Sequence, residues 1–244
     1  MQENRKARIE LGTLHFQEAN EQVRAALAEA DMVELQDVFA QRYLGCAMPT
    51  GKRLEIHGTP GNDMASYMDG GQIEVFGNVQ DQIGNTMNEG LIVVHGRCGD
   101  AAGYAMRGGS IFIRDDCGWR VGINMKQYEA KRPAIFIGGN AGNFLGEYMA
   151  GGIIVLLGRP GKYLASGMHG GVIYLAHRLP DEEIAPGLMQ EVVSDDDIQL
   201  LQGLIDSYRA YFSDDGELPS IPQASAFWKV TPQSARPYAS MYAH

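Results

Sequence analysis

The chain repeats one short pattern at intervals of 19 residues, and this repeat restricts the fold more than any other feature. Aligned on their apolar runs, the units are separated by 19, 19, 19, 24, 19 and 19 residues, and they begin at Lys52, Gly71, Gly90, Gly109, Pro133, Gly152 and Gly171. A weaker unit begins near Asp31. A short fixed period is typical of solenoids, in which one unit forms one coil and stacked coils bury a common core.

The first half of each unit alternates apolar and other residues with a period of two. The third residue of the units is Leu54, Ile73, Ile92, Ile111, Ile135, Ile154 and Ile173, and the fifth is Ile56, Val75, Val94, Ile113, Ile137, Leu156 and Leu175. Mostly β-branched residues at alternate positions predict a β-strand. Coils spaced by about 4.8 Å stack such residues into ladders that face a central core. The pattern therefore predicts an all-β fold, a single-stranded parallel β-helix of about eight coils.

The second half of each unit carries a methionine and, three residues before it, a small residue. The methionines are Met68, Met87, Met106, Met125, Met149 and Met168, and the glycines among the small residues are Gly84, Gly103, Gly122 and Gly146. Glycine is expected where the backbone has positive φ or where no side chain fits between coils. The methionines have the same chemical neighbours in every coil, which favours core packing over a thioether metal site. We therefore expect both sets to form structural ladders.

The ends of a β-helix expose strand edges that must be covered. Residues 1–31 contain a helical pattern that we expect to cap one end, and residues 32–179 form the β-helix. Residues 180–213 contain a second helix, which begins at the N-cap Ser194 before three aspartates and is expected to cap the other end. Residues 214–244 form an extended arm. Its aromatic residues, Trp228 among them, suit either its own surface or a partner's.

The single long interval contains an insert, "KQYEAKR", between Met125 and Pro133. A stacked coil can accommodate extra residues only in an outward loop. The insert is basic within a chain of net charge −10. It is either a solvated bulge or a partner contact, and Lys126, Tyr128 and Arg132 are the contact candidates, together with Trp228 of the arm.

Composition excludes several functions. A net charge of −10 argues against nucleic acid and anionic membrane surfaces, since both require a basic face. The first residues have no apolar signal region, and the longest apolar run is too short to span a membrane. Three cysteines without a CxxC motif indicate a reducing compartment, so a cytoplasmic protein is expected.

No catalytic, cofactor-binding or metal-binding residues are predicted in this chain. There is no P-loop and no nucleophile elbow. His57 and His95 share a column two coils apart, which is too far for one zinc ion. Cys98 and Cys117 stack in adjacent coils, where two small residues are favoured over a disulfide. The neighbouring Asp115 and Asp116 would point to opposite faces of a strand rather than form a glycosidic pair.

Four stretches carry a resemblance to a known family: "GNVQDQIGNTMNEG", "GRCGDAAGYAMRGG", "VGINMKQYEAKRPAIFIGGNAGNFLGEYMAGG" and "GKYLASGMHGGVIYL". Residues 31–178 resemble the GXGXG domain at the C-terminus of the glutamate synthase large subunit. More distantly, they resemble the formylmethanofuran dehydrogenase subunit that contains the same domain, and its formyltransferase/hydrolase relatives. The resemblance implies a right-handed parallel β-helix. The insert is more similar to the glutamate synthase branch.

The resemblance implies an architectural role and no catalytic residues for this chain. The glutaminase cysteine, the iron–sulfur ligands and the flavin barrel of glutamate synthase have no counterparts here. We therefore expect a non-catalytic subunit that holds amidotransferase and FMN synthase chains, with FMN and iron–sulfur clusters in those partners. The alternatives are a scaffold of a formyl-transferring complex and a self-sufficient β-helix hydrolase. Homo-oligomerisation remains open.

Overall fold

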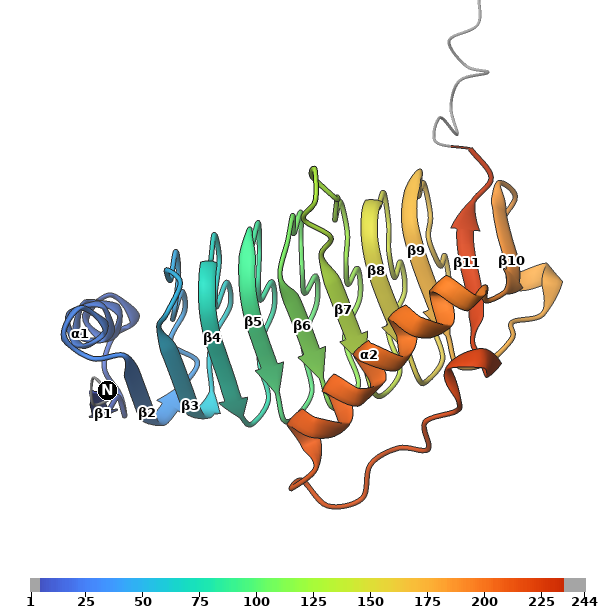
Figure 1. Ribbon diagram of the computed structural model, residues 1–244. Coiled ribbons are helices and arrows are strands. Elements are labelled where there is room, and N and C mark those ends of the chain that lie inside the picture. The colour runs from blue at the N-terminus through green and yellow to red at the C-terminus, as the bar shows by residue number, and fades with distance from the viewer. Residues whose placement is uncertain (1–4, 235–244) are drawn as a thin grey trace, which may run out of the picture.

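The computed structural model describes residues 5–234, which form a rod of stacked coils (Figure 1). Each coil contributes one long strand to a single sheet that runs the length of the rod. Eight of these strands are parallel neighbours in chain order: β2 (Met32–Phe39), β3 (Arg53–Thr59), β4 (Asp69–Phe76), β5 (Glu89–Val94), β6 (Ser110–Ile113), β7 (Ala134–Ile137), β8 (Ala150–Leu156) and β9 (Gly170–Leu175). The predicted parallel β-helix of about eight coils is confirmed.

The register of the strands is the one that the sequence columns predict. Leu54 pairs with Ile73, and the same column continues coil by coil as far as Ile173. The insert leaves the register intact, because Ile111 pairs directly with Ile135 across it. A second ladder of single bridges runs beside the sheet through Val79, Cys98, Cys117, Ala141 and Pro160. The extra residues are therefore confined to a loop outside the stack.

The methionine and glycine ladders lie in the core. The six ladder methionines are at most 2% exposed. The four ladder glycines have φ between +65° and +71°. A Cβ atom on Gly122 would lie 2.7 Å from Cδ1 of Ile154, so positive φ and close packing both favour glycine at this position.

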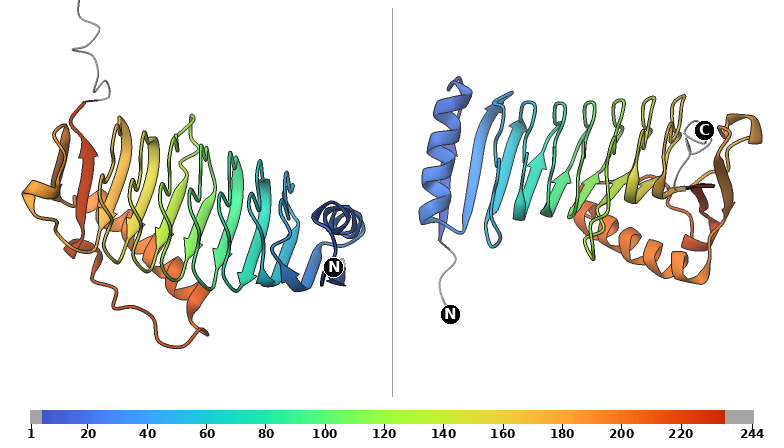
Figure 2. Two further views of the ribbon diagram at one scale, coloured as in Figure 1. Left: turned by 180° about the vertical axis from the view of Figure 1, so that it is seen from behind. Right: turned by 90° about the horizontal axis from the view of Figure 1, so that it is seen from above.

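The N-terminal end of the rod is capped by a helix, as predicted. Helix α1 (Phe16–Glu29) lies across this end (Figure 2) and buries Val23 and Leu27 in the core. Asn20 Nδ2 donates a hydrogen bond of 2.7 Å to the carbonyl of Arg42, which fixes the helix to the coil. A short strand that the repeat did not predict, β1 (Lys6–Glu10), lies parallel beside β2 at this end.

The C-terminal end is covered by strands, and here the predicted helical cap is wrong. Strands β10 (Leu188–Val192) and β11 (Trp228–Pro232) extend the sheet antiparallel, with β11 inserted between β9 and β10. The short 3₁₀ helix η1 (Asp181–Glu183) precedes β10, and η2 (Ala224–Ala226) precedes β11. The described part of the arm therefore lies on its own chain, while Tyr238 and Tyr242 lie outside the described residues.

The second helix, α2 (Asp195–Phe212), lies across the outer face of the sheet instead of at its end (Figure 1). The reason is the character of that face. Where α2 covers it, the outward residues of the strands are apolar: Val93, Phe112, Phe136, Val155 and Tyr174. Helix α2 buries its own apolar residues against them. In earlier coils the corresponding positions hold Glu55 and Glu74, which leaves that part of the face polar.

Both ends of α2 are held by polar contacts. Ser194 and Asp197 form a capping box, and Tyr174 Oη donates to Asp197 at 2.5 Å. Lys229 Nζ lies 3.0 Å from the same carboxylate. Burial opposes the charged form of Asp197, but the hydrogen bonds from Tyr174, Ser194 and Lys229 outweigh it and hold the pKa of its carboxyl well below the usual range. Near the other end, Tyr208 Oη donates to the carbonyl of Arg114 at 2.9 Å.

Candidate functional site

The irregular second half of each coil has a regular backbone conformation. In seven successive segments, every second residue has positive φ, three to a segment; Gln82, Gly84 and Thr86 are one example. The first and third of these residues donate to the next coil, as Gln82 N does to the carbonyl of Asp100 at 2.8 Å. The middle residue donates to the previous coil, as Gly84 N does to the carbonyl of Met64 at 2.9 Å. These segments therefore cross-link the coils in both directions.

Several outer positions of these segments hold large aromatic residues in the left-handed conformation. Tyr67, Tyr148 and Tyr163 have φ of 57°, 52° and 62°. This conformation costs an L-residue roughly 1–2 kcal/mol. The three rings are also 58%, 46% and 61% exposed, so burial within this chain offsets little of the cost. Small or polar residues such as Gln82 and Thr86 adopt the same conformation at equivalent positions, so the exposure of the three rings is what distinguishes them.

The exposed rings recur in several coils along the rod. Six of the eleven large apolar residues that are exposed among the described ones come from the irregular segments, and we call them the aromatic face: Tyr43, Tyr67, Tyr104, Trp119, Tyr148 and Tyr163. The segments lie on the sides of the rod that α2 leaves uncovered (Figure 2). Aromatic residues are enriched in protein interfaces. The aromatic face is therefore the candidate docking surface.

The predicted contact residues of the insert lie at an edge of the rod and are exposed. Lys126, Tyr128 and Arg132 project in a loop that folds back over the preceding coils, where Lys131 Nζ lies 3.0 Å from Glu89 Oε2. Cavities of about 530 and 410 Å³ flank the loop. The structure thus makes the insert accessible, and its role in partner binding stays a prediction.

The fourth predicted contact, Trp228, lies in β11 near the C-terminal end of the sheet. It pairs with Leu175 of β9 and with Val192 of β10. The guanidinium of Arg178 lies over its ring at 5.3 Å. Trp228 is half-buried by its own chain.

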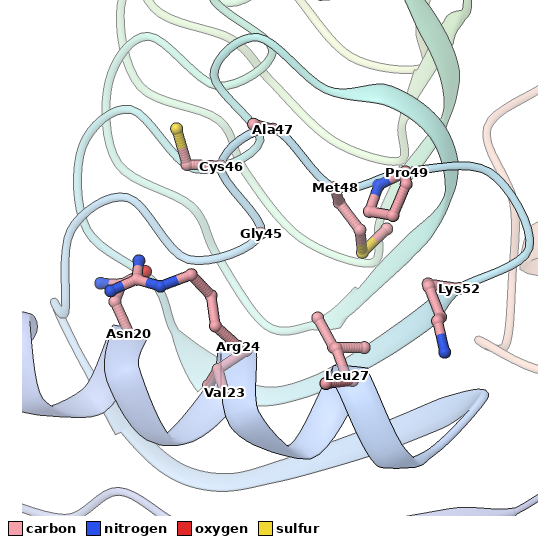
Figure 3. A pocket seen from close by; sticks show the side chains of 11 residues that line it. Asn20, Val23, Arg24, Leu27, Gly45, Cys46, Ala47, Met48, Pro49 and Lys52 are labelled. Carbon is pink, nitrogen blue, oxygen red and sulfur yellow. The ribbon is translucent and has the colours of Figure 1, made fainter.

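A cavity of about 370 Å³ lies between α1 and the first irregular segment (Figure 3). Its walls include Val23, Leu27 and Met48, and the last two side chains point toward each other across it. Cys46 lines the outer part, and burial raises the pKa of its thiol. The cavity is mainly apolar and contains no cluster of catalytic groups.

A half-buried histidine, His95, joins the segment after α2 to the sheet. His95 Nδ1 lies 2.5 Å from Oδ2 of Asp215, and its Nε2 lies 3.1 Å from Oε1 of Glu74. Arg53 pairs with Glu74, and Arg114 lies 3.6 Å from Asp215. Burial disfavours the imidazolium, but the hydrogen bonds and charges of Glu74 and Asp215 outweigh it and raise the pKa of His95. The hydrogen bond from His95 is the main cause that lowers the pKa of Glu74.

This arrangement predicts a pH-dependent stability. Because the pKa of His95 in the folded protein lies above the unfolded value of about 6.5, its imidazolium stabilises the fold fully below that pH. The contribution is lost as the pH rises through the folded-state pKa. We expect thermal unfolding to show the wild type more stable than His95→Gln at pH 6, with a smaller difference at pH 9.

His57 provides a matched control, because its ring stacks on the opposite side of Phe76 from His95. Within residues 5–234, His57 forms no ion pair with a carboxylate of the kind that His95 makes. His57→Gln should therefore leave the pH dependence of the wild type unchanged. An equal pH dependence in the wild type and in His95→Gln would contradict the assignment of His95 as the titrating group.

The remaining candidates from the sequence have structural roles. Cys98 and Cys117 are bridge partners in adjacent coils and are free thiols, and burial raises the pKa of Cys117. Asp116 Oδ1 accepts from the backbone of Asn140 at 2.7 Å. Within residues 5–234, no group of three or more potential metal ligands lies close enough to hold an ion. No helix in that range is long and apolar enough to cross a membrane.

Comparison with known proteins assigns the chain to a family. The GXGXG motif family matches residues 18–233. The chain belongs to the GXGXG family. The motif's name describes glycine at alternate positions, which is the spacing of the three left-handed residues in each segment. In this member of the GXGXG family, glycine fills the middle position in five of the seven segments, and the outer positions hold other residues except at Gly167.

Two relatives extend the comparison. An uncharacterized protein of Methanocaldococcus jannaschii is 33% identical over 248 residues, covering 96% of this chain and 95% of its own length. A chain of the formyltransferase/hydrolase complex from Methylorubrum extorquens, solved with methylofuran, superposes with a TM-score of 0.64. It is 21% identical, and the match covers 87% of this chain and 88% of that one. This second likeness shows a shared fold.

Proposed function

We propose that this chain is a non-catalytic scaffold subunit of a glutamate synthase-type complex, which forms glutamate from glutamine and 2-oxoglutarate. The aromatic face is the observation that carries the proposal, because strained and exposed rings suit a surface that other chains cover. The chain would hold a glutaminase chain and an FMN synthase chain in register. FMN and iron–sulfur clusters would belong to those partners.

The insert supports the glutamate synthase branch over other members of the family. The sequence "NMKQYEAKRP" resembles that branch, and the side chains of Lys126, Tyr128 and Arg132 within it are exposed. In the proposed complex, Lys126, Tyr128 and Arg132 contact a partner chain.

A second candidate is a scaffold subunit of a formyltransferase/hydrolase or formylmethanofuran dehydrogenase-type complex. The favouring observation is the superposition with a chain of the M. extorquens complex over 87% of the present chain. In that case the partners would contain metal centres in place of FMN.

Gentle affinity purification of the tagged chain from its own host distinguishes these functions. The measurements are the native mass and the visible absorbance spectrum of the material. Larger partners with flavin and iron–sulfur absorbance are the expected result. A colourless complex with bound zinc, molybdenum or tungsten would favour the formyl-transferring candidate. A partner-free rod with turnover of its own would overturn both.

A further inference from the structure

We propose that the N-terminal half of the aromatic face docks a partner segment rich in arginine. The inference rests on the proposed scaffold function and names the chemistry of the partner surface. The observations that carry it are carboxylates without ion pairs, exposed rings in the same and neighbouring segments, and a net charge of −10 that disfavours a second copy of this chain as the occupant.

Three carboxylates lie in successive irregular segments of this half: Asp63, Asp81 and Asp100. Asp81 and Asp100 occupy the same column in neighbouring coils, about 5 Å apart along the rod. Oδ1 of each carboxylate accepts a hydrogen bond within the chain. Asp81 Oδ1 accepts from the backbone N–H of Asp100 at 2.8 Å, and Asp100 Oδ1 accepts from that of Trp119 at 2.7 Å. None of the three forms an ion pair with any of residues 5–234. Their charge is therefore available to a partner.

Exposed rings flank these carboxylates. Tyr67, Tyr104 and Trp119 are 58%, 38% and 53% exposed and belong to the same or adjacent segments. Rings attract cations over their faces, and arginine does so while its guanidinium also pairs with carboxylates. The chain makes one such contact in the coils that follow, where Arg120, next to Trp119 in the sequence, lies 4.9 Å from the ring centre of Phe144.

A second copy of this chain is a poor occupant. The chain carries a net charge of −10, and the other half of the face offers few cations. Arg120 is already paired with Glu147 at 2.9 Å, and the exposed cations Lys126, Arg159 and Lys162 are spread over different coils. A second copy would bring more carboxylates than cations to the contact, because the chain has 30 acidic and 20 basic residues. A basic partner segment matches the charge better than self-association does.

The test uses the full chain and a fluorescent nona-arginine peptide, with binding measured by anisotropy. The variant Asp81→Asn with Asp100→Asn removes two charges and keeps the oxygens that accept from the next coil. Asparagine already accepts this kind of hydrogen bond in the same column, where Asn62 Oδ1 accepts from the backbone N–H of Asp81 and Asn143 Oδ1 accepts from that of Lys162. The matched control is Glu182→Gln with Glu183→Gln, which removes two charges from the exposed η1.

We expect the Asp81→Asn, Asp100→Asn variant to bind the peptide at least tenfold more weakly than the wild type, and the η1 control to bind it as the wild type does. Trp119→Ala should also weaken binding, and nona-lysine should bind less tightly than nona-arginine. Equal losses in both charge variants, or no binding by the wild type, would overturn the inference. So would a wild-type dimer that this variant dissociates, because the face would then belong to a second copy.

Purification of the native complex distinguishes a failure of this inference from a failure of the proposed function. If the wild type captures its partners and the Asp81→Asn, Asp100→Asn variant captures them equally well at every salt concentration, the scaffold function stands and the docking inference fails. If the wild type binds nona-arginine as described but purifies without partners, the scaffold function fails.

Discussion

Replacing Met106 by alanine is expected to lower the free energy of unfolding by about 2–5 kcal/mol. Met106 is fully buried at the middle of the methionine ladder. Backbone hydrogen bonds hold its coil on both sides: Arg107 N donates to Met87 O at 2.8 Å, and Lys126 N donates to Met106 O at 3.0 Å. The stacked coils therefore limit how far the cavity can collapse, and this places the cost high in the range.

Urea unfolding followed by circular dichroism measures this loss. Met189→Ala is the matched control, because Met189 is 41% exposed in β10, and its loss should stay within about 0.5 kcal/mol. Met106→Leu keeps most of the volume and should cost less than about 1.5 kcal/mol. If Met106→Ala were as stable as Met189→Ala, the ladder would not be part of a tightly packed core.

The stack of coils could be predicted from the sequence because the spacing of the repeat determines which residues pair in the sheet. A column such as Leu54, Ile73 and Ile92 in the sequence becomes a row of paired residues in the sheet. Each coil repeats the environment of the one before it, so the pattern accumulates over the units. Elements that occur once have no such support. Strands β1, β10 and β11 were missed for that reason.

The position of α2 could not be predicted from its own sequence. An amphipathic helix shows that an apolar face exists and not which surface covers it. The missing signal was in the strands, where outward positions change from Glu55 and Glu74 to Phe112 and Phe136 along the rod. The contact between His95 and Asp215 joins residues 120 positions apart, and no local pattern indicates it.

The candidate surface was only partly predictable. The insert was identified because it breaks the period, and it is exposed as expected. The aromatic face could not be predicted from the repeat, because its residues occupy several columns that hold small or polar residues in other coils. Tyr67 and Tyr148 share such a column, and large residues at left-handed positions are the signal that could have found the face.

Replacing Tyr208 by alanine is expected to cost about 3–5 kcal/mol and to loosen α2 from the sheet. Tyr208 is fully buried, and its ring stacks on Phe136 with the centroids 4.5 Å apart. A Cβ atom on Gly138 would clash with its hydroxyl, so the sheet leaves room for this side chain. Tyr208→Phe removes only the hydrogen bond to Arg114 and should cost about 0.5–1.5 kcal/mol. Tyr128→Ala in the exposed insert is the neutral control.

Hydrogen exchange read by mass spectrometry locates this loss along the rod. Each coil of a solenoid contacts mainly its neighbours, so coils distant from a lesion retain their stability. In Tyr208→Ala, the amides of α2 and of β6–β9 beneath it should exchange faster, while those of β2 and β3 stay protected. Equal acceleration in all strands would mean that α2 and the β-helix unfold as one cooperative unit. Faster exchange confined to α2, with β6–β9 still protected, would instead make α2 a separable cover of the apolar face, stabilised mainly by the contacts around Tyr208.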